Sequence, residues 1–197
     1  MNILKEWERD PPSEPMDSMP ALWYDFQRRR ADPKSPVHRF RDNIPDACAL
    51  DGSGQVALRR AVRSRRPNNG KMHNHQSKVS PALPALEEKL MKYLPALMRC
   101  ETFGALYHLI ELLRTPGIGP MTTYDVAVRF GAWLELKPDS IYLHAGTTAG
   151  LKALGFELRG WNTSIAMEAL PRILRRKDPD EVEDFLCTYR RAFELLP

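Results

Sequence analysis

The chain has 197 residues, of which 43% are hydrophobic, and its formal net charge at pH 7 is +4. This length and apolar content suit one domain with an appendage and exclude a wholly disordered chain. No segment approaches the roughly eighteen apolar residues of a membrane span, and the first residues lack the apolar run of a signal peptide. The three cysteines are odd in number and widely spaced, which indicates a reducing compartment. We therefore expect a cytoplasmic monomer without membrane contact.

The positive charge is concentrated in one part of the sequence. Residues 28–80 contain 13 Lys or Arg and 4 Asp or Glu, a net charge of +9, whereas residues 81–197 contain 14 and 15, a net charge of −1. A local positive segment beside a near-neutral body is typical of a protein that docks a polyanion on one face. The alternative is a basic tail that is merely solvated.

Residues 1–54 are rich in proline and short polar runs, so we expect an irregular extension that packs on the folded part. Within it, the apolar cluster Leu22–Phe26 is compatible with an anchoring helix. Residues 55–66 favour a short basic helix. The remaining sequence, from residue 55 to residue 197, is expected to form a single helical domain.

From residue 81 onward, apolar residues recur at helical spacing, and proline and glycine mark the ends of the segments. Asp178 followed by Pro179 is a typical helix start, because aspartate caps the helix and proline suits its first position. No run of alternating strand residues is evident, so the expected class is all-α. The helices are expected at residues 81–94, 102–114, 121–133, 145–154, 163–174 and 179–195.

The most informative segment joins the second and third of these helices. Gly117 and Gly119 flank the single apolar residue Ile118, so the backbone can turn sharply and approach a ligand closely while Ile118 enters the core. The N–H groups from Gly117 to Met121 then open the next helix with its positive dipole end behind them, which predicts a phosphate site. The alternative is a turn for which glycine is needed only sterically.

The sequence Pro-Gly-Ile-Gly, with an amphipathic helix before it and Thr122-Thr123 and an Ala/Val-rich helix after it, resembles the hairpin of the helix-hairpin-helix DNA glycosylase superfamily. The hairpin occupies residues 104–131, and the looser resemblance extends over most of residues 81–197. It implies a glycosylase-like fold that binds DNA phosphates, without reading sequence, through Gly117, Ile118, Gly119, Pro120, Met121 and Thr122. It also implies a possible monovalent cation at the hairpin carbonyls and no other cofactor.

This resemblance implies excision or processing of a damaged or modified base that is flipped out of the duplex. Family members that also cleave the strand have a lysine where this chain has Met121, so Schiff-base lyase chemistry is not expected. The alternatives are a DNA-binding module that has lost its chemistry and a protein-interaction domain.

The position of the family's catalytic aspartate has two candidates in this chain. Alignment on Leu154-Gly155 places it at His144, whereas counting from the hairpin without a gap places it at Asp139. A carboxylate there would stabilise the developing oxocarbenium ion and activate water, and a neutral histidine would serve as a base. The structural alternatives are that His144 caps its own helix or contacts a phosphate, and that Asp139 is a turn residue.

Two other polar clusters have a structural and a functional interpretation. The first follows a tight turn at Asn69-Gly70 and contains the expected DNA-contacting residues Lys71, His73, Asn74, His75 and Gln76; the alternative is an ordinary polar loop. No cysteine or carboxylate stands at ligand spacing from its two histidines, so no metal site is expected. The second comprises the four cations in residues 172–177, which are explained by a favourable interaction with a helix C-terminus.

Overall fold

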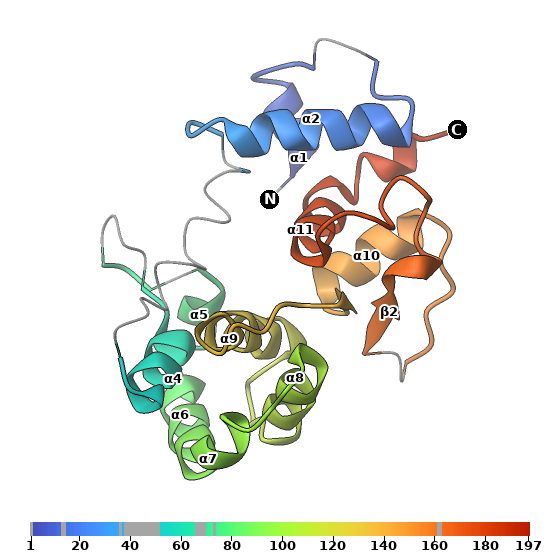
Figure 1. Cartoon of the computed structure of the whole chain (residues 1–197). Helices are drawn as coiled ribbons and strands as arrows, with labels where there is room; N and C mark the ends of the chain where they lie inside the picture. The colour runs from blue at the N-terminus through green and yellow to red at the C-terminus, as the bar shows by residue number, and fades with distance from the viewer. Residues whose placement is uncertain are drawn as a thin grey trace. The chain divides into compact units, whose positions relative to one another are not determined.

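The computed structural model describes residues 2–12, 15–35, 37, 52–65, 70–72, 74–160 and 163–197, of which residues 74 and 75 are described by their backbone only. The chain divides into two compact units: unit 1 is Met1–Arg41 with Asp139–Pro197, and unit 2 is Asp42–Pro138. This division differs from the expected extension at residues 1–54 and single domain at residues 55–197. The N-terminal segment and the C-terminal third belong to one unit, and the hairpin belongs to the other (Figure 1).

The described part of unit 2 is built from helices, and its turns are set by proline and capping residues. The hydroxyl of Thr102 caps α8 by accepting a hydrogen bond from the N–H of Ala105 at 3.1 Å. Pro120 occupies the first position of α9, where a missing N–H costs nothing. The elements are α4 (Gly54–Arg63), α5 (Asn74–Lys78), η2 (Ser80–Ala82), α6 (Leu83–Lys92), α7 (Leu94–Leu97), α8 (Phe103–Leu112) and α9 (Pro120–Trp133).

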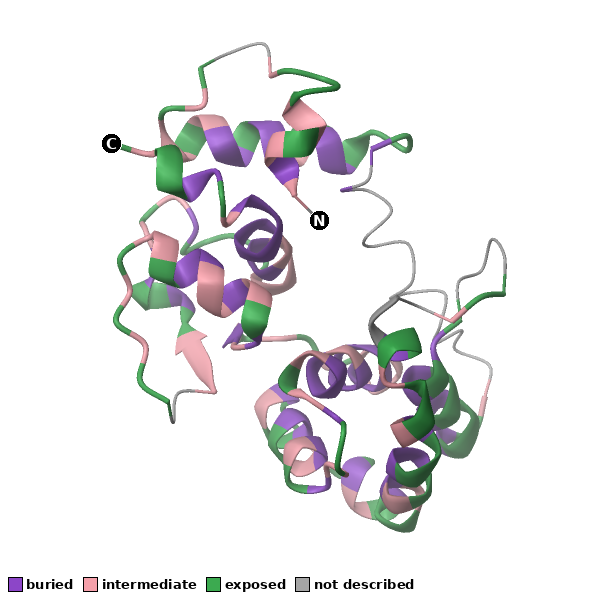
Figure 2. Cartoon of the chain, turned by 180° about the vertical axis from the view of Figure 1, so that it is seen from behind, coloured by how far each residue is buried: buried purple, intermediate pink, exposed green. Residues whose placement is uncertain are grey.

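The core of unit 2 forms where α4, α6 and α8 contribute apolar stripes next to α9. Leu58, Leu86, Leu106 and Phe130 come from four different helices, and each is completely buried. α9 packs against both α4 and α8, and Figure 2 shows that its residues are largely buried. The long helix of the hairpin is therefore the centre of this unit.

Unit 1 combines helices from both ends of the chain with one small sheet. Its helical elements are α1 (Ile3–Trp7), α2 (Met19–Ala31), α10 (Ala145–Ala153), η3 (Met167–Ala169), α11 (Pro179–Tyr189) and η4 (Phe193–Leu195). β1 (Ser140–Tyr142) pairs antiparallel with β2 (Ser164–Ala166), with Ile141 opposite Ile165. The protein is mostly helical, with this two-stranded sheet as the only one among the described residues.

The expected helix at residues 163–174 is not formed. Its first residues pair as β2 with β1, and a 3-10 turn and a loop follow. Ile165 and its partner Ile141 are β-branched and suit a paired strand. This pairing joins segments more than twenty residues apart, which a local helical period cannot reveal. The last helix also ends earlier than expected, at Tyr189.

α10 and α11 form a close contact because two glycines of α10 face α11. A side chain at Gly146 would collide with the sulfur of Cys187, and one at Gly150 would collide with the carbonyl of Leu186. The two backbones therefore approach to a distance that no larger residue permits at these positions. This contact fixes α10 on the central helix of unit 1.

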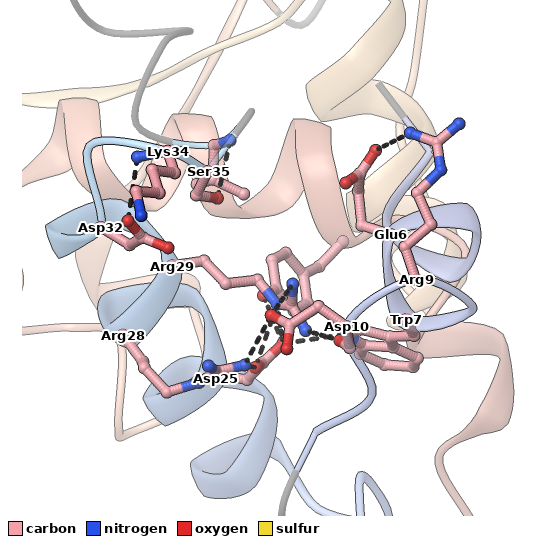
Figure 3. Close-up of polar contacts among 12 residues, drawn as sticks. Glu6, Trp7, Arg9, Asp10, Asp25, Arg28, Arg29, Asp32, Lys34 and Ser35 are labelled. Atoms are coloured by element: carbon pink, nitrogen blue, oxygen red, sulfur yellow. Dashed lines mark hydrogen bonds and ion pairs between the residues drawn. The ribbon is translucent and has the colours of Figure 1, made fainter.

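The N-terminal segment is tied to unit 1 by a buried aspartate. Asp25 of α2 is only 2% exposed and accepts hydrogen bonds from Trp7 Nε1 at 2.8 Å and from the hydroxyl of Tyr189 at 2.7 Å. The buried side chain of Arg29 donates to the same carboxylate at 2.9 Å and also pairs with Asp10, as Figure 3 shows. The network joins α1, α2 and α11, so residues 19–31 are an ordered part of the unit and not an irregular extension.

Candidate nucleic-acid interface

The turn between α8 and α9 has, at Gly117, the backbone conformation that favours glycine. Gly117 has φ +87°, in the left-handed region that favours glycine, and a β-carbon there would lie 3.2 Å from that of Ala82. Ile118 is 7% exposed, and its N–H donates to the carbonyl of Thr115 at 3.1 Å. The apolar residue is thus buried, and it fixes the two glycines at either side of it.

Gly119 is the N-cap of α9 and has ordinary extended geometry. A β-carbon added there would meet nothing within 4 Å, so the space beside it is open. The carbonyl of Gly119 accepts from the N–H of Thr123 at 3.1 Å and from its hydroxyl at 3.2 Å. The helix α9 has fourteen residues, and its N-cap provides no side-chain hydrogen bond to the N–H groups of the first turn. Such a terminus favours an anion.

The side chains after Gly119 differ in their accessibility. Pro120 is exposed and Met121 is partly exposed, whereas Thr122 is 4% exposed. The side chain of Thr122 therefore faces the core and is not presented on the surface. Of this residue, only the backbone N–H at the start of α9 is relevant to an approaching phosphate.

The described part of the polar segment before α6 is held by one backbone bridge and one side-chain hydrogen bond. Arg65 and Met72 form an isolated antiparallel bridge, and Arg65 Nη1 donates to the carbonyl of Gly70 at 2.9 Å. Lys71 is exposed. His73 lies outside the described residues, and the side chains of Asn74 and His75, at the start of α5, do as well.

Gln76, expected on the DNA-contacting surface, is instead completely buried. Its Nε2 donates to Asp125 Oδ2 on α9 at 3.3 Å, and the same oxygen lies 3.6 Å from Arg129 Nη2. Gln76 therefore anchors α5 to the hairpin helix. A polar run in a sequence does not distinguish an anchor of this kind from a surface contact, because both require hydrogen-bonding side chains.

The helix α4 carries exposed cations in the same unit as the hairpin. Arg59, Arg60 and Arg63 are all exposed, and Arg65 follows them. Glu87 of α6 pairs with Arg59 at 3.1 Å and with Arg63. The pairs fix two guanidinium groups on the surface of α4. Because α4 packs on α9, its positive charges and the hairpin belong to one folded body.

His144 is the N-cap of α10 and is 3% exposed. The N–H of Gly146 donates to its Nδ1 at 3.2 Å, so the proton of a neutral ring lies on Nε2, which donates to Glu183 Oε1. The N–H of His144 donates to the hydroxyl of Thr147 at 2.9 Å, which completes a capping box. Both ring nitrogens are therefore engaged: Nδ1 caps the first turn of α10, and Nε2 joins α10 to α11.

Asp139 is exposed on the loop before β1 and accepts a hydrogen bond from the hydroxyl of Tyr142 at 3.3 Å. Of the two candidates for the catalytic position, only Asp139 presents its side chain on the surface. Both candidates belong to unit 1, whereas the hairpin and Lys71 belong to unit 2. The expected site residues are thus divided between the two units.

One group of buried side chains has ligand types suited to a metal ion. Ligand atoms of His144, Glu183 and Cys187 all lie within 4.8 Å of one another. In the observed arrangement Glu183 already accepts a hydrogen bond from His144 Nε2, and burial raises the pKa of the Cys187 thiol to about 12. These three residues therefore act as a buried polar contact between α10 and α11. Glu183 was not expected as a site residue, although a carboxylate within the apolar run of α11 needs a buried partner.

No known protein family, curated protein or solved structure matches the chain. Along the described part of the chain, no helix has the length and apolar character needed to cross a membrane.

Proposed function

We propose that this protein binds DNA through the phosphate backbone, with the hairpin between α8 and α9 as its principal contact. The observation that supports this most directly is the start of α9. Gly119 borders open space and provides no side-chain cap for the first turn, and Ile118 is buried so that the turn is fixed. A phosphate oxygen there would accept hydrogen bonds from the backbone and would lie at the positive end of the helix dipole.

The surrounding charge supports a polyanionic partner. The exposed arginines of α4 and the exposed Lys71 belong to the same unit as the hairpin. Each lysine or arginine that neutralises a phosphate releases bound counterions, so the affinity for DNA should fall steeply as salt is added. A contact made by backbone N–H groups and guanidinium groups to phosphate carries no sequence information. Binding is therefore proposed to be largely independent of sequence.

The test is the affinity of the full chain for a fluorescent duplex, measured by anisotropy. Gly119→Arg should weaken binding by roughly tenfold or more, because its side chain would occupy the space through which a phosphate approaches the backbone. Gly160→Arg is the matched control, since a β-carbon there also meets nothing within 4 Å and the added charge is the same. Equal affinity of the two variants would contradict the role of the hairpin.

Base excision is a second candidate function, supported by the exposed carboxylate of Asp139. Such a carboxylate would stabilise a cationic sugar or activate water, without lyase chemistry because Met121 provides no amine. The experiment is incubation with duplexes that contain a panel of modified bases, followed by alkali to cleave abasic sites. Cleavage that Asp139→Asn abolishes would support the enzyme. DNA binding without cleavage on any duplex would instead support a DNA-binding module without catalysis.

A further inference from the structure

Four cations gather on the loop that precedes α11. Arg172, Arg175, Arg176 and Lys177 are all exposed on this segment, which we call the basic loop (residues 171–177). The sequence suggests that they stabilise a helix C-terminus, but residues 163–178, all of them described, contain no end of an α-helix. The next helix instead begins just after them, at Pro179, and a helix N-terminus favours anions over cations. The helix dipole therefore does not account for this charge.

The basic loop is held in place by its apolar residues. Leu170 lies directly before the loop and Leu174 lies within it, and both are completely buried. The N–H of Leu174 donates to the carbonyl of Pro171 at 2.8 Å, and Arg175 Nε donates to the carbonyl of Leu170 at 2.7 Å. The ammonium group of Lys177 lies 5.6 Å from the centre of the Trp23 ring. The loop thus presents its charges from a fixed backbone, so little backbone conformational entropy would be lost on binding.

Acidic residues near the loop offset only part of its charge. Residues 172–178 contain four cations and the single carboxylate of Asp178, a net charge of +3. Asp180 and Glu181 follow in the first turn of α11, and Glu181 is engaged by Arg30 at 3.3 Å and by Gln27 at 3.3 Å. Arg172 and Arg176 project from the same short loop, and guanidinium groups bind phosphate oxygens through paired hydrogen bonds.

We infer that the basic loop is a second contact for DNA phosphates, supplied by unit 1 in addition to the hairpin of unit 2. This inference rests on the proposed function, because it takes DNA as the partner. It assigns to the unit that carries Asp139 its own means of holding the duplex. Two contacts that engage one duplex at the same time bind it more tightly than either alone, because the second binding event is then intramolecular.

The test uses the full chain with both exposed arginines changed, Arg172→Gln and Arg176→Gln. These two are chosen because Arg175 and Lys177 also make contacts within unit 1. The control is Lys152→Gln with Arg191→Gln, two exposed cations of unit 1 outside the loop, which removes the same charge. Duplex affinity is measured at several salt concentrations, and thermal unfolding verifies that both proteins are folded.

If two phosphate contacts are lost, the slope of log affinity against log salt should become less steep by about 1.8, since each contact contributes about 0.9. The control pair should leave the slope within about 0.5 of the wild-type value, which is less than the contribution of a single phosphate contact. Equal changes for the two pairs would overturn the inference, because they would reflect net charge alone. Loss of binding to phosphatidylserine vesicles with an unchanged slope on DNA would also overturn it, and would identify a lipid surface as the partner.

The failure of this inference is distinguishable from the failure of the proposed function. If Gly119→Arg weakens DNA binding as expected and the loop variant has the wild-type slope, only the inference is wrong. If the wild-type chain does not bind DNA at all, both are wrong. If the loop variant reduces the slope while Gly119→Arg is without effect, the loop is the contact and the hairpin is not.

Discussion

The buried carboxylate of Asp25 gives the most direct test of how unit 1 is held together. We expect Asp25→Ala to lower the free energy of unfolding of unit 1 by about 3 kcal/mol, because removal of one partner of a buried ion pair costs roughly 3–5 kcal/mol. The lower end applies because Arg29 keeps its contact with Asp10, whose side chain is 61% exposed. Trp7 and Tyr189 would each also lose an acceptor.

The measurement is urea denaturation followed by tryptophan fluorescence, with hydrogen exchange used to assign the loss to peptides of unit 1. Glu6→Gln is the control, because Glu6 pairs with the exposed side chain of Arg9, and such surface pairs contribute about 0–1 kcal/mol. A loss below about 1 kcal/mol for Asp25→Ala, no more than a surface pair contributes, would refute the reasoning, as would an equal loss in unit 2.

The same residue predicts how stability depends on pH. Burial alone would raise the pKa of Asp25, but the hydrogen bonds from Tyr189, Trp7 and two arginines outweigh it and hold the pKa below its ordinary value of 3.8. A lowered folded-state pKa stabilises the fold fully above the unfolded-state value, and the contribution is lost as pH falls through the folded-state pKa. Wild-type unit 1 should therefore lose stability below about pH 4, and Asp25→Asn should lack this component of the loss.

Three further predictions follow from contacts described above. Gly150→Ala should destabilise unit 1 by about 1–3 kcal/mol in denaturant titrations, because its β-carbon would strike the carbonyl of Leu186; an unchanged midpoint would mean that the two helices can separate at no cost. Cys187 should resist a thiol reagent at about pH 8 until the protein unfolds, since burial raises its pKa to about 12. The partly exposed Cys100 should instead react in the folded chain. Peptide mapping of the modified sites checks this, and rapid labelling of Cys187 would contradict it. Glu87→Gln should strengthen DNA binding severalfold in the anisotropy assay, because it removes a carboxylate that neutralises two arginines of α4; weaker binding would argue against a role for α4.

Sequence patterns predicted those helices and turns whose backbone is set by residues within a few positions of them. The hairpin helices could be located because Gly117 and Gly119 mark the turn and Pro120 suits the first helical position. Pro179 likewise located the start of α11. In each of these places the residue that sets the backbone lies within a few positions of the feature it sets.

The elements that sequence reasoning missed depend on partners far along the chain. β2 exists because it pairs with β1, and the two-unit division exists because α2 packs against α11. Gln76 and His144 are polar residues whose partners, Asp125 and Glu183, lie 49 and 39 positions away. A polar side chain seen without its partner resembles a functional residue, which is why the sequence alone places both in the expected site.

Unit 1 is discontinuous in the sequence, and this has a consequence for how the protein folds. Its two parts are separated by the whole of Asp42–Pro138, so α2 cannot meet α11 until a long intervening chain has been closed. The entropic cost of closing a flexible loop increases with its length. We therefore expect unit 2 to fold first, and α2, which carries Asp25, to dock only after α11 has formed. Refolding monitored by pulsed hydrogen exchange should show protection in α9 before protection in α2.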